Sequence, residues 1–238
     1  MSNTALIESD FPFFHVFQPV MDLRDDSIYG FEVLLRSPDG RNPELIFAEA
    51  KEQGGLFDLD IHSIFKACET GMKTFHEVNL LLNVYPSTMV HPEFLPTMRQ
   101  IEEIVQIKPE NVVLEINESE KKEQFYMLQT VVKQLRQMGY LIALDDIGKG
   151  DATLQSIIEF EPDVVKLDRY FMRDLAVSHK KRRYLKKIIE VFGEDMHFVL
   201  EGLETAEDLR ISKALDIPLG QGFYLGRPEP TSFYKNEA

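Results

Sequence analysis

The stretch FQPVMDLRDDSIYGFEVLLR, residues 17–36, decides the fold. It covers most of two apolar segments with strand character, at roughly 13–22 and 28–36. The short polar segment DLRDDS joins the two. A crossover between parallel strands needs about a dozen residues or more, so this connection is too short for one. The two strands must therefore pair as an antiparallel hairpin.

Six further segments along the chain have strand character, because each is short, apolar and often β-branched or aromatic. They lie at roughly 79–85, 111–117, 140–146, 163–168, 197–202 and 219–225. Helix-like stretches separate most of them, and this alternation predicts parallel strands with crossover helices. Eight strands predict closure into a barrel. We expect an α/β fold, a modified TIM-type (β/α)8 barrel in which one strand is antiparallel to the rest.

The composition fits one globular domain. The chain has 238 residues, of which 44% are hydrophobic, and this is enough for one large core. No linker, low-complexity tract or clear repeat divides it, so we expect a single domain over residues 1–238, with 1–12 as a flexible or loosely packed N-terminal segment.

The charge and the chain start limit the partners and the location. A net charge of −14 disfavours DNA, RNA and anionic membranes as partners. The start MSNTALIESDFPFF has no basic segment followed by an apolar one, and no apolar run approaches the ~20 residues of a membrane span. Cys68 is the only cysteine, which excludes a disulfide within the chain. We expect a cytoplasmic protein without membrane insertion.

One basic run, HKKRRYLKK at 179–187, has two interpretations. It resembles a nucleic-acid-binding patch, but it also has the pattern of a helix with one solvated face. We favour the helix, with four apolar side chains turned inward: Tyr184, Leu185, Ile188 and Ile189.

Acidic residues stand at the ends of the predicted strands, although they are poor strand formers and costly to bury. The runs NVVLEINE, YLIALDD, DVVKLD and HFVLEGLE contain Glu115, Asp145, Asp146, Asp168 and Glu201. The C-terminal ends of barrel strands meet at one mouth. There we expect Asn83, Glu115, Asp145, Lys166, Glu201 and Gln221. Adjacent side chains cannot both point inward from a regular strand, so we expect Asp146 beyond the end of its strand.

These side chains predict a site for hard divalent cations. Carboxylate and amide oxygens favour Mg²⁺ or Mn²⁺. Two such ions ~4 Å apart can activate a water and stabilise the leaving oxygen of a phosphodiester. Arg36 and Lys166 would add positive charge for a phosphate.

Each signal has a structural alternative when it is taken alone. The Asp-Asp pair could be a turn, Glu115 and Glu118 could be an exposed loop edge, and Lys166 could form an ion pair with Asp168. Their shared position at strand ends favours one joint site.

The motifs together resemble the EAL domain family of cyclic di-GMP phosphodiesterases, from about Phe17 to Pro228. Eight segments carry the resemblance: FQPVMDL, FEVLLR, LNVYP, LEINES, LDDIGKG, VVKLDRYF, LEGLET and GQGFYLGRP. The second departs mildly, since it reads Glu32-Val33-Leu34 where the family has Glu-Ala-Leu. The resemblance implies a barrel with an antiparallel strand and hydrolysis of cyclic di-GMP to linear pGpG.

The resemblance also implies a role for each matching residue. The ligands of two Mg²⁺ or Mn²⁺ ions would be Glu32, Asn83, Glu115, Asp145 and Asp146. Lys166 and Glu201 would be catalytic, and Glu118 would stabilise the loop after the fifth strand. The substrate-binding residues would be Gln18, Arg36, Asp168 and Gln221. We expect Ca²⁺ to support binding but to inhibit catalysis, because its larger, looser shell holds water badly for attack.

One loop departs from the family pattern. The family usually reads Asp-Asp-Phe-Gly-Thr-Gly-Tyr-Ser-Ser-Leu, whereas this chain reads DDIGKGDATL, with Ile147, Lys149 and Asp151 at the changed positions. This departure keeps a second hypothesis open, a cyclic di-GMP receptor that acts through a partner protein. A protein-binding domain with a vestigial pocket is the third. The resemblance is compatible with a homodimer.

Overall fold

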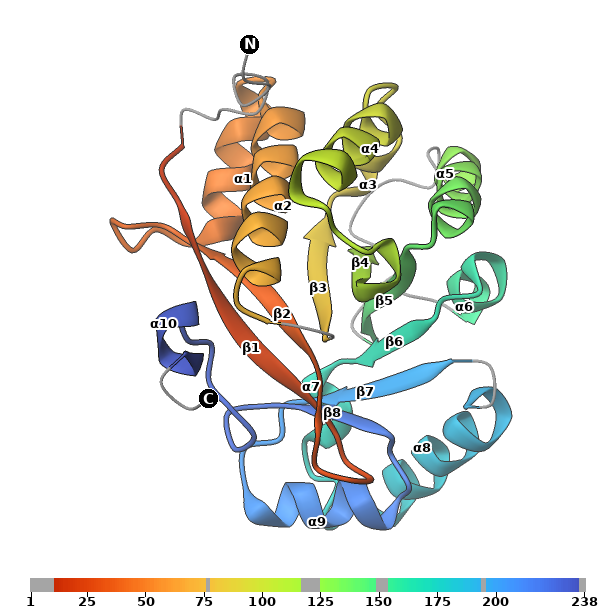
Figure 1. Cartoon of the computed structure of the whole chain (residues 1–238). Helices are drawn as coiled ribbons and strands as arrows, with labels where there is room; N and C mark the ends of the chain where they lie inside the picture. The colour runs from red at the N-terminus through yellow and green to blue at the C-terminus, as the bar shows by residue number, and fades with distance from the viewer. Residues whose placement is uncertain (1–10, 76–77, 117–124, 149–153, 194–195, 236–238) are drawn as a thin grey trace.

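The computed structural model describes residues 11–75, 78–116, 125–148, 154–193 and 196–235. In these ranges eight strands close into a barrel in sequence order (Figure 1). The first two, β1 (Phe14–Asp22) and β2 (Ile28–Arg36), are antiparallel neighbours. β1 is also antiparallel to β8 (Leu219–Gln221). The predicted hairpin and the predicted barrel with one reversed strand are therefore confirmed.

The other strands pair in parallel around the barrel. They are β3 (Asn79–Val84), β4 (Val112–Ile116), β5 (Leu141–Ile147), β6 (Val164–Leu167) and β7 (His197–Glu201). Their bounds lie close to the predicted ones, except at β8, which ends four residues before the predicted 225. The chain turns there because the backbone of Gly222 lies against Leu203, where an added Cβ would lie 2.2 Å from the carbonyl oxygen.

Helices form the outer layer of the molecule (Figure 1). Between β2 and β5 the chain forms α1 (Pro43–Glu52), α2 (Leu56–Met72), α3 (Pro86–Met89), α4 (Phe94–Val105), the 3-10 turn Pro109–Asn111 and α5 (Phe125–Met138). The later helices are α6 (Leu154–Phe160), α7 (Arg169–Met172), α8 (His179–Phe192), α9 (Ala206–Ala214) and α10 (Thr231–Tyr234). None of the helices in the described ranges combines the length and apolar composition that a membrane crossing requires.

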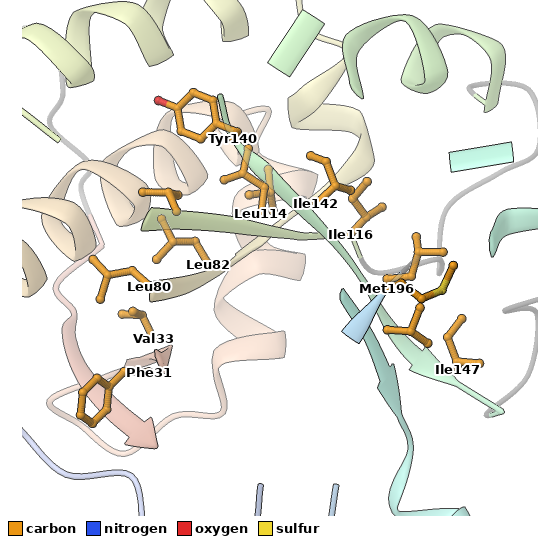
Figure 2. Close-up of a cluster of buried hydrophobic side chains, with 14 of the residues drawn as sticks. Phe31, Val33, Leu80, Leu82, Leu114, Ile116, Tyr140, Ile142, Ile147 and Met196 are labelled. Carbon is orange, nitrogen blue, oxygen red and sulfur yellow. The ribbon is translucent and has the colours of Figure 1, made fainter. Parts of the chain in front are cut away.

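The strands bury apolar side chains on both faces. The outward face packs against the helices, and Figure 2 shows part of this cluster, including Phe31, Val33, Leu80, Leu82, Leu114, Ile116 and Ile142. A separate cluster consists of Val20, Leu81, Val113, Ala143, Val164, Val199 and Leu219. Because side chains alternate along a strand, this second cluster lies inside the barrel. We call it the barrel floor.

Helix α8 confirms most of the amphipathic pattern predicted for the basic run. Leu185 is fully buried, and Ile188 and Ile189 are partly buried against the core. The inward placement of Tyr184 was wrong, because its side chain is 49% exposed. The apolar stripe of α8 runs through residues 185, 188, 189 and 192, and position 184 turns away from it.

Candidate active site

Five of the predicted side chains meet inside the barrel, four of them near the C-terminal ends of their strands and Glu32 in the middle of β2. The Nζ atom of Lys166 lies 3.3 Å from a carboxylate oxygen of Glu32 and 3.3 Å from one of Glu115. It lies 3.4 Å from an oxygen of Asp145 and 3.1 Å from one of Glu201. The strands β2, β4, β5, β6 and β7 each supply one of the five groups, and Lys166 is only 1% exposed.

Strand alternation explains why these side chains share one level. A position two residues beyond a floor residue faces the same side of the strand. Val113 precedes Glu115 in this way, as Val164 precedes Lys166. The same spacing gives Asn83, Asp145, Glu201 and Gln221 on their strands, and Gln18 on the reversed β1. The barrel interior therefore has a polar layer directly above its apolar floor.

Two amides fix the carboxylate of Glu32. The Nε2 atom of Gln221 donates to its Oε2 at 2.6 Å, and the Nδ2 atom of Asn83 donates to its Oε1 at 3.2 Å. Glu32 and Gln221 are buried, whereas Asn83 is exposed at the mouth. A carboxylate held by two donors and an ammonium has a defined orientation before any ligand arrives.

Burial and charge act on the site in opposite directions. Burial raises the pKa of Glu115 well above its usual value, although the ammonium of Lys166 opposes this. Burial alone would lower the pKa of Lys166, but Asp145 and the other carboxylates outweigh it, so the pKa of Lys166 lies well above its usual value. This direction favours the protonated form of Lys166 at neutral pH. Burial also raises the pKa of Glu201 to about 7, again against the effect of Lys166.

The Asp145–Asp146 pair sits in an irregular part of β5. The predicted position of Asp146 beyond the strand was wrong, because β5 continues to Ile147, which pairs with Leu167 of β6. The register shifts between Leu144 and Ile147, and Asp146 has a left-handed backbone with φ +55°. Asp is one of the few residue types that tolerate this conformation. A bulge of this kind re-aims side chains, which a regular strand would send to opposite faces.

The bulge brings Asp146 into a group of three carboxylates. Asp145, Asp146 and Glu201 each offer an oxygen, and these oxygens lie within 4.8 Å of one another. All three side chains are partly buried. The group is therefore a candidate cation site at the edge of the Lys166 cluster.

The side chains fit a divalent ion by a separate criterion. Among the described residues, the buried Oε1 atoms of Glu115 and Gln221 have no hydrogen-bond partner. An unsatisfied buried polar atom costs about 1–3 kcal/mol, which a bound cation would recover. The donors are all oxygen atoms, and this set suits Mg²⁺ or Mn²⁺.

Two cavities flank the carboxylates and share Glu32. The first has a volume of about 360 Å³ and is also lined by Arg36 and Asn83. Arg36 is half-buried there, and its Nη1 donates to the carbonyl of Leu35 at 2.8 Å. The second has a volume of about 200 Å³ and is lined by Gln18, Gln221 and Glu201, among others. Gln18 donates from Nε2 to the carbonyl of Gly226 at 3.1 Å.

The structure describes only one of two further predicted residues, Asp168 and Glu118. Asp168 is buried, and its Oδ1 accepts the backbone N–H of Tyr170 at 2.7 Å, so it caps the N-terminus of α7. Its predicted contact with substrate stays a prediction. Glu118 lies outside the described residues, as do residues 1–10 of the N-terminal segment.

The strand-end rule missed the residues that loops and helices add to the cavities. Arg169 and Phe223 line the second cavity, and Phe47 and Tyr85 line the first. The rings of Phe47 and Tyr85 lie 5.1 Å apart between centroids. None of these residues ends a strand on a polar side chain. The sequence signal was that Tyr85, Arg169 and Phe223 lie within the motifs LNVYP, VVKLDRYF and GQGFYLGRP.

A model of the EAL domain matches residues 4–228. The chain belongs to the EAL domain family. The cyclic di-GMP phosphodiesterase PdeB of Shewanella oneidensis is 27% identical over 227 residues, which cover 92% of this chain and 26% of that protein. The chain thus spans about a quarter of this curated relative, and 27% to 31% of the length of three other relatives.

Solved structures agree with this EAL membership. The manganese/cyclic di-GMP complex of Klebsiella pneumoniae BlrP1 is 27% identical, with a TM-score of 0.85, and covers 94% of this chain and 58% of that one. The calcium/cyclic di-GMP complex of the same protein is 26% identical, with a TM-score of 0.85, and covers 97% and 59%. The architecture of the EAL domain is therefore the architecture of this chain.

Proposed function

We propose that this EAL domain is a metal-dependent phosphodiesterase that hydrolyses cyclic di-GMP to linear pGpG. The observation that carries the proposal is the buried ammonium of Lys166 among four carboxylates from four other strands. Such a cluster is costly to bury, and a cation-dependent reaction gives a reason to maintain it. The relationship to phosphodiesterases at 27% identity or less supports the same reaction.

The ligands of two Mg²⁺ or Mn²⁺ ions would come from Glu32, Asn83, Glu115, Asp145 and Asp146. Bound divalent ions would lower the pKa of a coordinated water and would neutralise charge on a phosphate. The two amides on Glu32 and the bulge at Asp146 would orient these ligands in advance. The fully buried Glu115 would be a ligand that solvent does not reach.

The catalytic roles would fall to Lys166 and Glu201. Lys166 keeps its proton, so it would orient the attacking water and stabilise negative charge that develops on the phosphate. With a pKa of about 7, Glu201 would accept a proton at neutral pH. Arg36 would contact a phosphate from the rim of the first cavity.

The test is hydrolysis of cyclic di-GMP by the purified chain with Mg²⁺, Mn²⁺ and Ca²⁺ in parallel, with linear pGpG quantified by chromatography. We expect turnover with Mg²⁺ and Mn²⁺, little with Ca²⁺, and none for Glu32→Ala with any of the ions. Glu52→Ala, on the exposed surface of α1, is the matched control and should keep wild-type turnover. Absence of turnover in the wild-type protein with every ion would refute the proposal.

A second candidate function is a receptor that binds cyclic di-GMP and acts on a partner protein. The departure of the DDIGKGDATL loop from the family pattern favours it, because Ile147, buried in the core, replaces a Phe beside the Asp pair. Calorimetric binding of cyclic di-GMP without any pGpG would identify the receptor. A homodimer and a cytoplasmic location remain predictions.

A further inference from the structure

The short helix α7 lies between the two loops that follow the carboxylates of the candidate cation group. It begins directly after β6, which runs between β5 and β7. β5 carries Asp145 and Asp146, and β7 carries Glu201. Figure 1 places α7 close to β7. Any shift of this helix therefore acts on both sides of the group.

On one side, α7 contacts the loop after the Asp pair. A Cβ added to Gly148 would lie 2.3 Å from Cε2 of Phe171 and 2.9 Å from its Cζ, so the aromatic ring rests on the Gly148 backbone. Gly148 has φ +105° and stands two residues after Asp146. The backbone N–H of Asp168, the cap of α7, donates to the carbonyl of Ile147 at 3.2 Å. The residues that directly follow the Asp146 bulge are therefore fixed by contacts with α7 and its cap.

On the other side, α7 contacts the residue that follows Glu201. Gly202 has φ +79°, and a Cβ added to it would lie 2.9 Å from the Cβ of Arg169 and 3.9 Å from that of Met172. Both loops thus use a glycine with positive φ where they meet α7. A side chain at either position would push the helix and the loop apart.

A lysine on α8 secures the other end of the short helix. The Nζ atom of Lys181 donates to the carbonyls of Tyr170 and Arg173, both at 2.6 Å. It also lies 4.1 Å from the centroid of the Tyr170 ring. Asp168 caps the first end of α7 and Lys181 satisfies carbonyls at the second, so four helical residues are held from both sides.

We infer that α7 is a spacer that sets the distance between the Asp145–Asp146 pair and Glu201. Phe171 and Lys181 are its positioning residues, Phe171 through Gly148 and Lys181 from α8. The inference rests on the proposed function and adds Glu201 to the metal ligands named there, because the distance matters only if the oxygens of Asp145, Asp146 and Glu201 bind the same cation. Loss of Phe171 would let the Asp146 bulge relax away from Glu201, and the three oxygens would no longer fit one cation.

The test is Mn²⁺ affinity, measured by calorimetry and by electron paramagnetic resonance on the full chain without nucleotide. Phe171→Ala removes the ring, and we expect Mn²⁺ to bind about 10- to 100-fold more weakly, the usual cost of losing a residue that orients a metal ligand. Phe171→Tyr keeps the ring and should retain the affinity. Lys181→Met keeps the aliphatic stem but loses the two hydrogen bonds, and we expect about a tenfold loss.

The control is Lys180→Met on the same helix, whose ammonium lies 5.9 Å from the centroid of the Tyr184 ring. It should bind Mn²⁺ like the wild type. Thermal unfolding of each variant shows whether it is folded. If Phe171→Ala does not fold, the Mn²⁺ affinity of Lys181→Met tests the inference. If Phe171→Ala and Lys181→Met are folded and bind Mn²⁺ as tightly as the wild type, the inference is overturned but the proposed metal site is not. Absence of Mn²⁺ binding in the wild-type chain overturns the proposed metal site and the inference with it.

Discussion

The two inward-facing layers of the barrel lie two residues apart on the same strands, yet they differ in nearly every property. The floor is apolar and fully buried, and it contains Leu81, Val113 and Val199. Two residues further along each strand stand Asn83, Glu115 and Glu201. On β2 the floor position is Gly30, where an added Cβ would lie 2.8 Å from Cδ1 of Leu81.

The difference shows that the barrel separates stability from chemistry by strand position. The floor excludes water from below, so the polar layer sits on a medium of low dielectric, where charges interact strongly. This strengthens the attraction between Lys166 and its carboxylates, and it also raises the cost of leaving any of them unpaired. Substitutions in the two layers should therefore have different signatures.

The largest effect should come from Lys166→Met, which removes the only cation of the cluster among the described residues. Four carboxylates would then share a buried site without a counter-charge, and we expect a loss of about 3–5 kcal/mol in unfolding free energy without metal. Mn²⁺ should restore part of it, because a divalent ion replaces the lost charge. Urea unfolding with and without Mn²⁺ measures both effects.

Lys187→Met, on the exposed face of α8, is the matched control for this experiment and should leave the unfolding curve in place. An unchanged stability in metal-free Lys166→Met would mean that the carboxylates are protonated or solvated. The contrast between the layers would then lose its electrostatic basis.

The next effect should come from the floor. Leu81→Ala truncates a fully buried side chain, and we expect a loss of about 3 kcal/mol from the lost transfer free energy and the cavity. Mn²⁺ affinity should stay at the wild-type value, because no ligand atom has changed. Leu45→Ala, 64% exposed on α1, is the control. A Leu81→Ala protein that is stable but loses its metal would show that the floor shapes the site directly.

Sequence alone predicted the regular part of this comparison. The rule that the C-terminal ends of barrel strands meet at one mouth placed Glu115 and Lys166 there, and the six residues of DLRDDS required a hairpin. The first inference uses a rule of barrel architecture and the second a minimum connection length, and neither depends on the particular tertiary contacts of this chain.

The irregular part could not be predicted in the same way. Asp146 lies in a bulge with a left-handed backbone, and nothing in the letters DDIG distinguishes this bulge from a loop. β8 ends at Gln221 because Gly222 meets the backbone of Leu203, which is distant in sequence. Asp168 reads as a strand-end acid like Glu115, but it caps α7. Each of these outcomes depends on a neighbour that only the folded chain provides.

A smaller effect should appear in the pH dependence of stability. The folded-state pKa of Glu201 is raised from 4.5 to about 7, so its contribution to stability is present below pH 4.5 and is lost as the pH rises through about 7. Because Lys166 shares the electrostatic interaction, we expect this loss to be about 2 kcal/mol, less than the shift alone would give. Urea unfolding of the metal-free chain between pH 4.5 and 7.5 measures it.

The comparison variant for this experiment is Glu201→Gln, which cannot ionise and should lack this part of the slope. Glu204→Gln, more than half exposed on the neighbouring loop, should retain it. Equal slopes in the wild type and Glu201→Gln would place the titration on another group of the cluster.

The smallest effect on stability should come from Gln221→Met, in the polar layer itself. The substitution loses the 2.6 Å hydrogen bond to Glu32, but it also removes the buried Oε1 atom that has no hydrogen-bond partner among the described residues. These terms nearly cancel, so we expect a change of about 1 kcal/mol or less in unfolding free energy. Turnover of cyclic di-GMP should nevertheless fall by about tenfold, because Glu32 keeps only Asn83 as an amide donor.

Gln137→Met, on the exposed face of α5, controls for the loss of a surface amide and should change neither quantity. The pairing of a small stability change with a large activity change is the reverse of the pattern expected for Leu81→Ala. If Gln221→Met lost stability and activity in proportion, its amide would be part of the packing. The boundary between the two layers would then lie above Gln221 on β8, because a residue that acts only through folding belongs with the floor.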